Sequence, residues 1–396
     1  MPTRAPAFRH DPVKSVLPLH SADTPSYWDR EPAICGYRRL TYNSRSLDRA
    51  VDVPVSATPA VVPGAGVVVA SDDGYVRFHN TDLSKVYWQR RLNSAVYASL
   101  VVDPDRRRIL VAATSGLITC FDLRGTLVWA TDIGRQVFAT PAPMPAARIL
   151  FVAAFGGRVF GLDLATGRIL FERAVPQPWH TAHGGSAAHR DPYASPAVTA
   201  GGNAVVCCAE HVLCFAPDGT ELWRRELGHS LKASPVALDT TGQVAVATVN
   251  GRVHFLDADT GGSRSCIDLS GKIVASPAVS GPVLAVGTQD GITTGIDIRN
   301  TKALWTSRLG APRSYTSFSV LPSGDFIATF ERGNVVCLRR DDGRFLWESS
   351  QVLGIPNHEP EMDITPAVGP DGHMYGASYT GALYHFLFRP RTEEDR

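Results

Sequence analysis

The sequence predicts an all-β fold, an eight-bladed β-propeller built of four-stranded antiparallel blades. The first observation is a triplet of the form Ala-Ser/Thr-Pro that recurs, with small variations, through the chain. The third residues of its copies are Pro59, Leu100, Pro141, Pro196, Pro235, Pro277, Phe318 and Pro366, in steps of 41, 41, 55, 39, 42, 41 and 48 residues. The second observation is that short β-branched runs separated by glycine turns fill each repeat. A period near forty residues with several short strands is the signature of a propeller blade.

Each repeat contains the same elements in the same order. The segment 34–42 is predicted to be one strand ahead of the first repeat, and every repeat then opens with the triplet and a short apolar run. A β-branched run such as 66–70 follows, and a turn ending in glycine leads into a run that alternates apolar and polar residues, such as 252–257. A second turn leads to a last run. One position of this run holds a tryptophan in five repeats, and Phe171 and Cys266 replace it in two: Trp88, Trp129, Phe171, Trp223, Cys266, Trp305 and Trp347.

The last repeat, 364–388, contains only three strands. We expect 34–42 to supply its missing outer strand, because that pairing closes the ring and covers two sheet edges. Residues 1–33 are then an extension that wraps the surface, 34–390 form the propeller, and 391–396 are a C-terminal tail. The alternative is a seven-bladed ring with an additional hairpin.

Composition excludes several classes of function. The net charge of +1 gives no reason to expect a nucleic acid or an anionic membrane as a partner. The N-terminus lacks the apolar run of a secretory signal, and no stretch approaches the roughly 18–20 apolar residues of a membrane span. Seven cysteines scattered over strand-like segments indicate reduced thiols. These features predict a soluble, cytoplasmic protein with no nucleic-acid partner and no membrane partner.

The repeats resemble the PQQ-like propeller repeat of quinoprotein dehydrogenases and of the outer-membrane assembly lipoprotein BamB. The Ala-Ser-Pro openings, the glycine turns and closings such as Ile296-Asp297-Ile298 followed by Leu304-Trp305 carry the resemblance, roughly over 51–390. It implies eight blades and a tryptophan that docks each blade on the next. The lipid-bearing cysteine of BamB-like lipoproteins needs a leader, and Cys35 has no such context.

The resemblance does not extend to the cofactor. The family's dehydrogenases hold calcium beside PQQ, and the acidic calcium site cannot be placed in this sequence. The adjacent pair Cys207-Cys208 is similar to a disulfide of that family, but it lies in a strand, where successive side chains point to opposite faces. We expect both to be core thiols. PQQ is therefore not expected. The cofactor is unknown, and the two possibilities are a divalent metal or no cofactor.

The residues just before the triplets are predicted to line the mouth of the central channel. In blade order they are Ser56, Tyr97, Phe138, Tyr193, Lys232, Val274, Tyr315 and Asp363. Two residues earlier, on the same side of the chain, come Pro54, Ala95, Gln136, Asp191, Ser230, Lys272, Arg313 and Glu361. These positions differ from blade to blade, which favours a polar, anionic or zwitterionic small ligand held by basic side chains. A rim that is polar only because water reaches it is the alternative. The predicted ligand-binding residues are Tyr97, Gln136, Asp191, Tyr193, Lys232, Lys272, Arg313 and Tyr315.

Two insertions, 176–191 and 351–363, lie between blades on the same face and hold four of the 12 histidines. Long loops on a rigid scaffold often carry function. One hypothesis is general acid–base catalysis, with these residues as candidates: His180, His183, His358, Glu361 and Asp363. Another is a metal site at His180, His183 and His189, although the spacing matches no common zinc motif. The third interpretation is a set of solvated loop histidines.

The sequence therefore predicts a soluble ligand-binding propeller with a small molecule at the central funnel. Its catalytic version is an enzyme of small-molecule or secondary metabolism, a lyase, hydrolase or cyclase that uses acid–base or metal-assisted chemistry. The alternative is a non-catalytic scaffold with a protein partner. A PQQ-dependent oxidoreductase ranks last.

Overall fold

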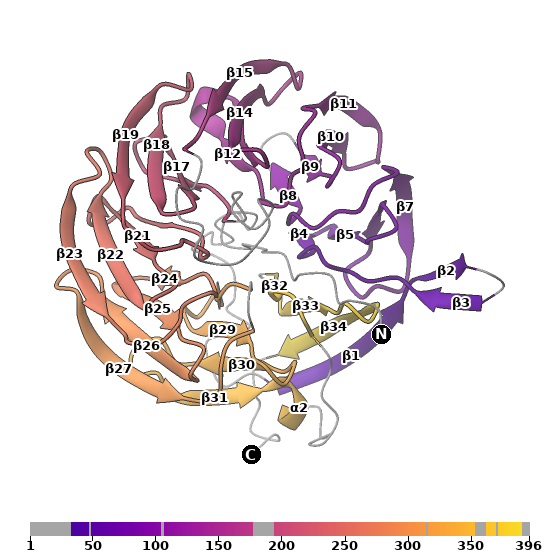
Figure 1. Ribbon diagram of the computed structural model, residues 1–396. Coiled ribbons are helices and arrows are strands. Elements are labelled where there is room, and N and C mark those ends of the chain that lie inside the picture. The colour runs from indigo at the N-terminus through magenta and orange to yellow at the C-terminus, as the bar shows by residue number, and fades with distance from the viewer. Residues whose placement is uncertain are drawn as a thin grey trace.

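The computed structural model of the protein describes residues 33–46, 49–103, 107–176, 194–313, 316–352, 362–369 and 371–389. Figure 1 shows a ring of blades around a central axis, and the strand pairings resolve it into eight four-stranded antiparallel sheets. The prediction of an all-β, eight-bladed propeller is confirmed. The predicted extension before residue 33 and the tail after 390 lie outside the described residues.

Within each of the first four blades, consecutive strands pair from the axis outwards. Blade 1 consists of β4 (Ala60–Val62), β5 (Gly66–Ala70), β6 (Tyr75–His79) and β7 (Val86–Arg91). Blade 2 consists of β8 (Val101–Asp103), β9 (Arg108–Ala112), β10 (Leu117–Asp122) and β11 (Leu127–Asp132). Blade 3 consists of β12 (Ala142–Met144), β13 (Ile149–Ala154), β14 (Arg158–Asp163) and β15 (Ile169–Ala174). Blade 4 consists of β16 (Ala197–Val198), β17 (Ala204–Cys208), β18 (His211–Phe215) and β19 (Glu221–Glu226).

Blades 5 to 7 repeat this order. Blade 5 consists of β20 (Val236–Leu238), β21 (Gln243–Ala247), β22 (Arg252–Asp257) and β23 (Ser263–Asp268). Blade 6 consists of β24 (Ala278–Ser280), β25 (Val283–Gly287), β26 (Ile292–Asp297) and β27 (Lys302–Arg308). Blade 7 consists of β28 (Ser319–Val320), β29 (Phe326–Thr329), β30 (Val335–Leu338) and β31 (Phe345–Glu348).

Blade 8 joins the two ends of the described chain. Its inner strands are β32 (Ala367–Val368), β33 (His373–Ala377) and β34 (Ala382–Arg389), and its outer strand is β1 (Ala33–Thr41). β1 runs antiparallel to β34, from Ala33 opposite Arg389 to Thr41 opposite Ala382. The predicted closure of the ring by an N-terminal strand is confirmed, and the seven-bladed alternative is wrong.

Three small elements were not predicted. β2 (Asn43–Ser46) and β3 (Arg49–Asp52) form a separate two-stranded hairpin, which projects outward from the ring in Figure 1. A 3-10 turn, η1 (Pro145–Ala147), precedes β13, and a single helical turn, α2 (Ser349–Val352), follows β31. No helix among the described residues is long and apolar enough to cross a bilayer.

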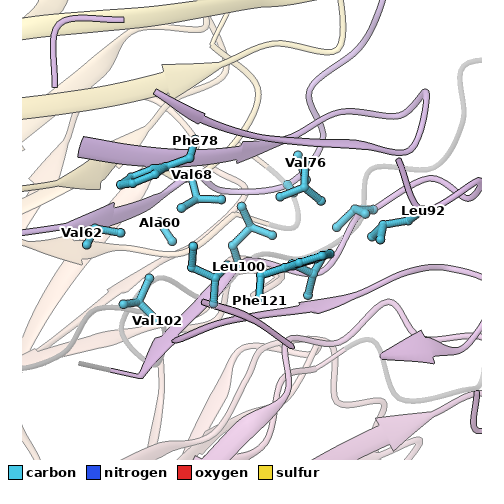
Figure 2. Packing of buried hydrophobic residues seen from close by; sticks show 14 of the residues in the cluster. Ala60, Val62, Val68, Val76, Phe78, Leu92, Leu100, Val102 and Phe121 are labelled. Atoms are coloured by element: carbon cyan, nitrogen blue, oxygen red, sulfur yellow. The ribbon is translucent and has the colours of Figure 1, made fainter. Parts of the chain in front are cut away.

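The hydrophobic core is distributed between neighbouring blades. Figure 2 shows the cluster between blades 1 and 2, in which Val68 and Phe78 of one blade face Leu100, Val102 and Phe121 of the next. Comparable clusters lie between the other blades. The second strand of most blades is buried on both faces, which explains its uninterrupted apolar sequence.

The middle residue of each triplet forms part of a belt of hydroxyl groups around the axis. This hydroxyl belt comprises Thr58, Ser99, Thr140, Ser195, Ser234, Ser276, Ser317 and Thr365, all of which are buried. In it, the backbone N–H of Ser195 donates to Ser234 Oγ, and that of Ser234 donates to Ser276 Oγ, each at 3.0 Å. Similar bonds join blade 2 to blade 3, 3 to 4, and 7 to 8. The hydroxyl thus satisfies a buried donor of the neighbouring blade, which is why the position is Ser or Thr.

Ser234→Ala is expected to lower the free energy of unfolding by about 1–3 kcal/mol, because it leaves the buried N–H of Ser195 without an acceptor. The measurement is chemical denaturation of the variant beside the parent protein. Ser99→Ala is the matched control, since Ser99 Oγ has no hydrogen-bond partner among the described residues. Equal losses in the two variants would contradict the role of the belt.

The outer strands dock through aromatic residues, as the family resemblance implied. Trp88 of blade 1 lies on Gly125 of blade 2 and donates its indole N–H to the carbonyl of Leu123 at 2.9 Å. The same arrangement recurs 35 residues apart at Trp129, Trp223 and Trp305. The turn must carry glycine, because its φ is positive and a Cβ at Gly125 would stand 2.6 Å from the Trp88 ring.

Three of the seven junctions from blade 1 to blade 8 depart from this pattern. At the junction of blades 7 and 8, the indole N–H of Trp347 is buried and has no hydrogen-bond partner among the described residues. Phe171 packs on Gly219 but has no indole donor to bond the next blade. At the junction of blades 5 and 6 the position is Cys266, and the facing turn carries Thr301 with a positive φ where other blades have glycine. There Ser265 Oγ and Thr301 Oγ1 lie 2.5 Å apart, so a hydroxyl pair replaces the ring contact.

Candidate functional site

The connectors that precede the triplets lie on one face of the ring, together with the turns between the second and third strands. The backbone N–H of Asp72 donates to the carbonyl of Pro54 at 2.9 Å, and equivalent bonds anchor Ala95, Gln136, Ser230 and Lys272. Because the pattern repeats, residues just before the triplets share one register at this face. We call it the mouth face.

Blades 1 to 3 bring an acid and three aromatic rings to the mouth face. Ser56 is buried and donates both its hydroxyl, at 2.8 Å, and its backbone N–H, at 3.3 Å, to the Asp72 carboxylate. In the next two blades the Tyr97 and Phe138 rings stack, with centroids 5.7 Å apart and planes 12° apart. Phe155 packs on Phe138 at 4.5 Å. Sequence analysis placed Tyr97 at this face, and the structure adds Asp72 and Phe155.

Two side chains of this group, Asp72 and Tyr97, have raised pKa values. Burial raises the pKa of Asp72 to about 7, against the opposing effect of the two hydrogen bonds from Ser56. Burial also raises the pKa of Tyr97, and the nearby Asp72 carboxylate adds to that shift.

Blades 7 and 8 bring two of the predicted site residues into contact with each other. Arg313 forms an ion pair with Asp363, which is almost fully buried. The other Asp363 oxygen accepts hydrogen bonds from the Ser378 hydroxyl and the Tyr379 backbone N–H, both at 2.9 Å. Arg313 also donates to the carbonyl of Glu331. The geometry gives these two side chains a role in joining blades; a role in ligand binding or acid–base catalysis stays a prediction.

The remaining predicted residues either lie apart from these two groups or fall outside the described residues. Gln136 and Lys272 are exposed, and Lys232 is half-buried beside its triplet. Most of the predicted catalytic and metal residues lie outside the described residues, as do three ligand-binding candidates: His180, His183, His189, Asp191, Tyr193, Tyr315, His358 and Glu361. Within the described ranges, no three His, Cys, Asp or Glu side chains are placed to hold a metal ion. The divalent-metal hypothesis rests on residues beyond those ranges.

Cys207 and Cys208 are buried, and neither forms a disulfide with a described residue. Cys207 packs in the core shared with blade 5, and Cys208 packs in the core shared with blade 3. Strand alternation sends the two side chains to opposite faces, as the sequence indicated. The pair therefore has the environment of core thiols.

The residues that sequence analysis missed share one position, the first residue of the turn between the second and third strands. In the blades discussed above this position holds Asp72, Phe155, Glu331 and Tyr379. It stands next to the connector before the triplet, so it belongs to the same rim. A second register, counted two residues back from the turn glycine, would have found Asp72.

Comparison with known proteins adds family information to this geometry. A family model described as outer membrane protein assembly factor BamB matches residues 40–215 and 208–383. The outer membrane protein assembly factor BamB of Burkholderia pseudomallei is 23% identical over 281 residues, which span 66% of this chain and 68% of that protein.

Solved structures show the same fold. BamB from Moraxella catarrhalis superposes with a TM-score of 0.68 at 16% identity, over 90% of this chain and 100% of that one. The quinohemoprotein alcohol dehydrogenase ADHIIG of Pseudomonas putida gives a TM-score of 0.66 at 12% identity, over 93% and 79% of the two chains. At such identities the likeness extends to the fold alone.

Proposed function

Because the chain belongs to the family of the outer membrane protein assembly factor BamB, we propose that it is a non-catalytic scaffold that binds a protein partner. Its relatives carry the name of an assembly factor, and this name favours protein partners over a small substrate. The enzyme of small-molecule metabolism expected from the sequence is not carried into this proposal. The quinoprotein alternative has only a shared fold in its support.

One structural observation carries the proposal: the outer strands of blades 1 to 3 begin with pairs of exposed apolar residues. We call this set the apolar outer strip, and its members are Val86, Tyr87, Leu127, Val128, Ile169 and Leu170. Leu127 is 54% exposed and Tyr87 is 50% exposed. Soluble proteins rarely leave neighbouring large apolar side chains in water unless a partner covers them.

The strip is not a general feature of the repeat. In blade 6 the residue just before the docking tryptophan, Leu304, is exposed, but the residue before it is Ala303. In blade 4 Leu222 is exposed and follows Glu221. In blade 7 the outer strand also starts with two large apolar residues, Phe345 and Leu346, but both are half-buried. Among the outer strands of blades 1 to 7, only those of blades 1 to 3 therefore start with two large apolar side chains that are both exposed. β7, β11 and β15 are also edge strands, which have unpaired backbone groups on one side.

These properties fit a partner segment that lies along the edge strands with its apolar side chains on the strip. Strand addition supplies backbone hydrogen bonds, and side-chain contacts supply specificity. We retain the cytoplasm as the proposed location, because none of the six cysteines whose side chains are described forms a disulfide with a described residue.

A photo-crosslinking amino acid at Leu127 or Leu170 is expected to capture one and the same protein in intact cells. The products are identified by mass spectrometry. Leu304 is the matched control, because it occupies in blade 6 the position that Leu170 occupies in blade 3, and it should give no such product. Identical products from all three positions, or none from the strip, would overturn the proposal. A captured protein of the cell envelope would overturn the cytoplasmic location while leaving the scaffold in place.

A further inference from the structure

We infer that the partner segment bound at the apolar outer strip is acidic, with Asp or Glu side chains next to the apolar residues that contact the strip. This inference rests on the proposed scaffold function and deepens it by naming the chemistry of the partner. A set of exposed bases carries it. We call this set the basic border, and its members are Lys85, Arg124 and Arg168.

Each base of the border lies at the start of one strand of the strip. Lys85 immediately precedes Val86 in β7, and Arg168 immediately precedes Ile169 in β15. Arg124 lies in the turn between β10 and β11. Because β7, β11 and β15 follow one another along the outer rim of the ring (Figure 1), the border follows the strip from blade 1 to blade 3.

The turns that precede β11 and β15 lie against the outer strand of the blade before them. Arg90 of β7 donates its Nε–H to the carbonyl of Gly125 at 2.7 Å. Thr131 of β11 donates its hydroxyl to the carbonyl of Gly167 at 2.6 Å. Each turn, with the base that it carries, therefore lies between two outer strands of the strip. A segment that covers one apolar pair then lies beside at least one base.

The acids and the bases of these turns differ in what they contact. One acid in each turn accepts backbone N–H groups of its own turn at 2.8–3.0 Å, and these acids are Asp82, Asp122 and Asp163. No described residue forms an ion pair with Lys85, Arg124 or Arg168. The carboxylates are thus used within the turns, whereas the exposed positive charges remain available to a carboxylate of a partner.

Charge selects the partner that approaches the strip. Surface ion pairs contribute little to affinity, but complementary charge speeds association and like charge disfavours wrong partners. Lys85 Nζ lies 5.6 Å from the centroid of the Tyr87 ring, so one charge of the border stands beside an apolar member of the strip. Blade 4 has the opposite composition, because Asp218 lies in the turn before β19 and Glu221 begins that strand. An acidic segment is favoured over blades 1 to 3 and disfavoured over blade 4.

The test is photo-crosslinking of the purified full chain, carrying the photo-crosslinking amino acid at Leu127, to two fluorescein-labelled peptides. The acidic probe is Gly-Glu-Val-Glu-Leu-Glu-Val-Glu-Gly, and the basic probe has Lys in place of each Glu. We expect at least about fivefold more product with the acidic probe in about 50 mM NaCl, and less than about a twofold difference in about 500 mM NaCl. Position Leu222 in blade 4 is the control and should give no preference for the acidic probe. Equal products at Leu127, or more product with the basic probe, would overturn the inference.

Charge variants assign the preference to the border. Arg124→Glu combined with Arg168→Glu should abolish it, whereas the corresponding changes to Lys should retain it. Arg299→Glu combined with Lys302→Glu is the matched control, because these exposed bases lie in the equivalent turn of blade 6. A preference that survives the reversal at the border, or that is lost equally in the control, contradicts the inference. If the reversed protein does not fold, the salt dependence of the parent decides.

Crosslinking at Leu127 in cells separates this inference from the proposed function. The peptide joined to the strip is sequenced by tandem mass spectrometry. A contact peptide with Asp or Glu beside the attachment site supports both the scaffold and its acidic partner. A neutral or basic contact peptide leaves the scaffold in place and overturns the acidic partner. The absence of any captured protein overturns the scaffold and this inference with it.

Discussion

Replacing Gly125 with alanine is expected to lower the free energy of unfolding by about 3 kcal/mol. Its φ of +77° is strained for any residue with a Cβ, and the new methyl group would meet the Trp88 ring at 2.6 Å. Backbone strain contributes roughly 1 kcal/mol and displacement of the packed indole roughly 1–3 kcal/mol. The measurement is denaturant unfolding, followed by tryptophan fluorescence and by circular dichroism.

Gly134 provides the matched control, because its φ is +67° and nothing lies within 4 Å of the position of its Cβ. Gly134→Ala should therefore show the backbone strain alone, about 1 kcal/mol. If Gly125→Ala costs no more than Gly134→Ala, the indole does not lock blades 1 and 2 together. The comparison separates the two reasons for which glycine stands in these turns.

Asp72→Asn is expected to stabilise the folded protein at pH 8 by roughly 2–4 kcal/mol and to give no gain near pH 3. The pKa of Asp72 is raised from 3.8 to about 7 by burial. Below the lower value, the carboxyl group is protonated in both the folded and the unfolded chain. Between about 4 and 7 the unfolded chain releases the proton first, so the stability of the parent falls as the pH rises. Above about 7 the full cost of the buried charge is present, and the neutral amide removes it.

The measurement is the free energy of unfolding of parent and variant at several pH values between 3 and 8. Glu331→Gln should change stability by less than about 0.5 kcal/mol at each pH, because Glu331 is exposed. A loss of stability in Asp72→Asn at pH 8 would show that the ionised carboxylate stabilises the mouth face.

The architecture could be predicted from the sequence because each blade repeats the same local requirements. The triplet spacing gave eight units, and the three-strand last unit required a strand such as 34–42 to complete its sheet. Periodicity does not tell why a repeated residue is needed. The use of Ser195 and Ser234 as hydrogen-bond acceptors across blades required coordinates, because their partners lie in neighbouring repeats. The hairpin β2–β3 was missed because 43–52 carries no repeat signal.

For the candidate site, the sequence could predict only which positions of each repeat lie at the mouth face. The triplet correctly placed Ser56, Tyr97 and Phe138 on one face, because the backbone fixes the start of every inner strand. The repeat pattern does not predict which side chains contact one another. Arg313 was predicted as a ligand-binding residue and Asp363 as a catalytic residue, and only the structure shows that the two form an ion pair between adjacent blades. Asp72 comes from a turn, and only the fold shows that the turn returns its side chain to Ser56.

The pairing of β1 with β34 sets the order in which the protein can assemble during synthesis. About 340 residues separate the two strands. Because a ribosome adds about 5–20 residues per second, β1 remains without its partner strand for roughly 17–70 s. Throughout that interval the nascent chain carries an unpaired strand at its beginning, which is open to pairing with other chains. The seven intervening blades can pack on their neighbours as they emerge. The ring closes last, and a chain that stalls before residue 382 remains an open arc whose two end strands lack their partners.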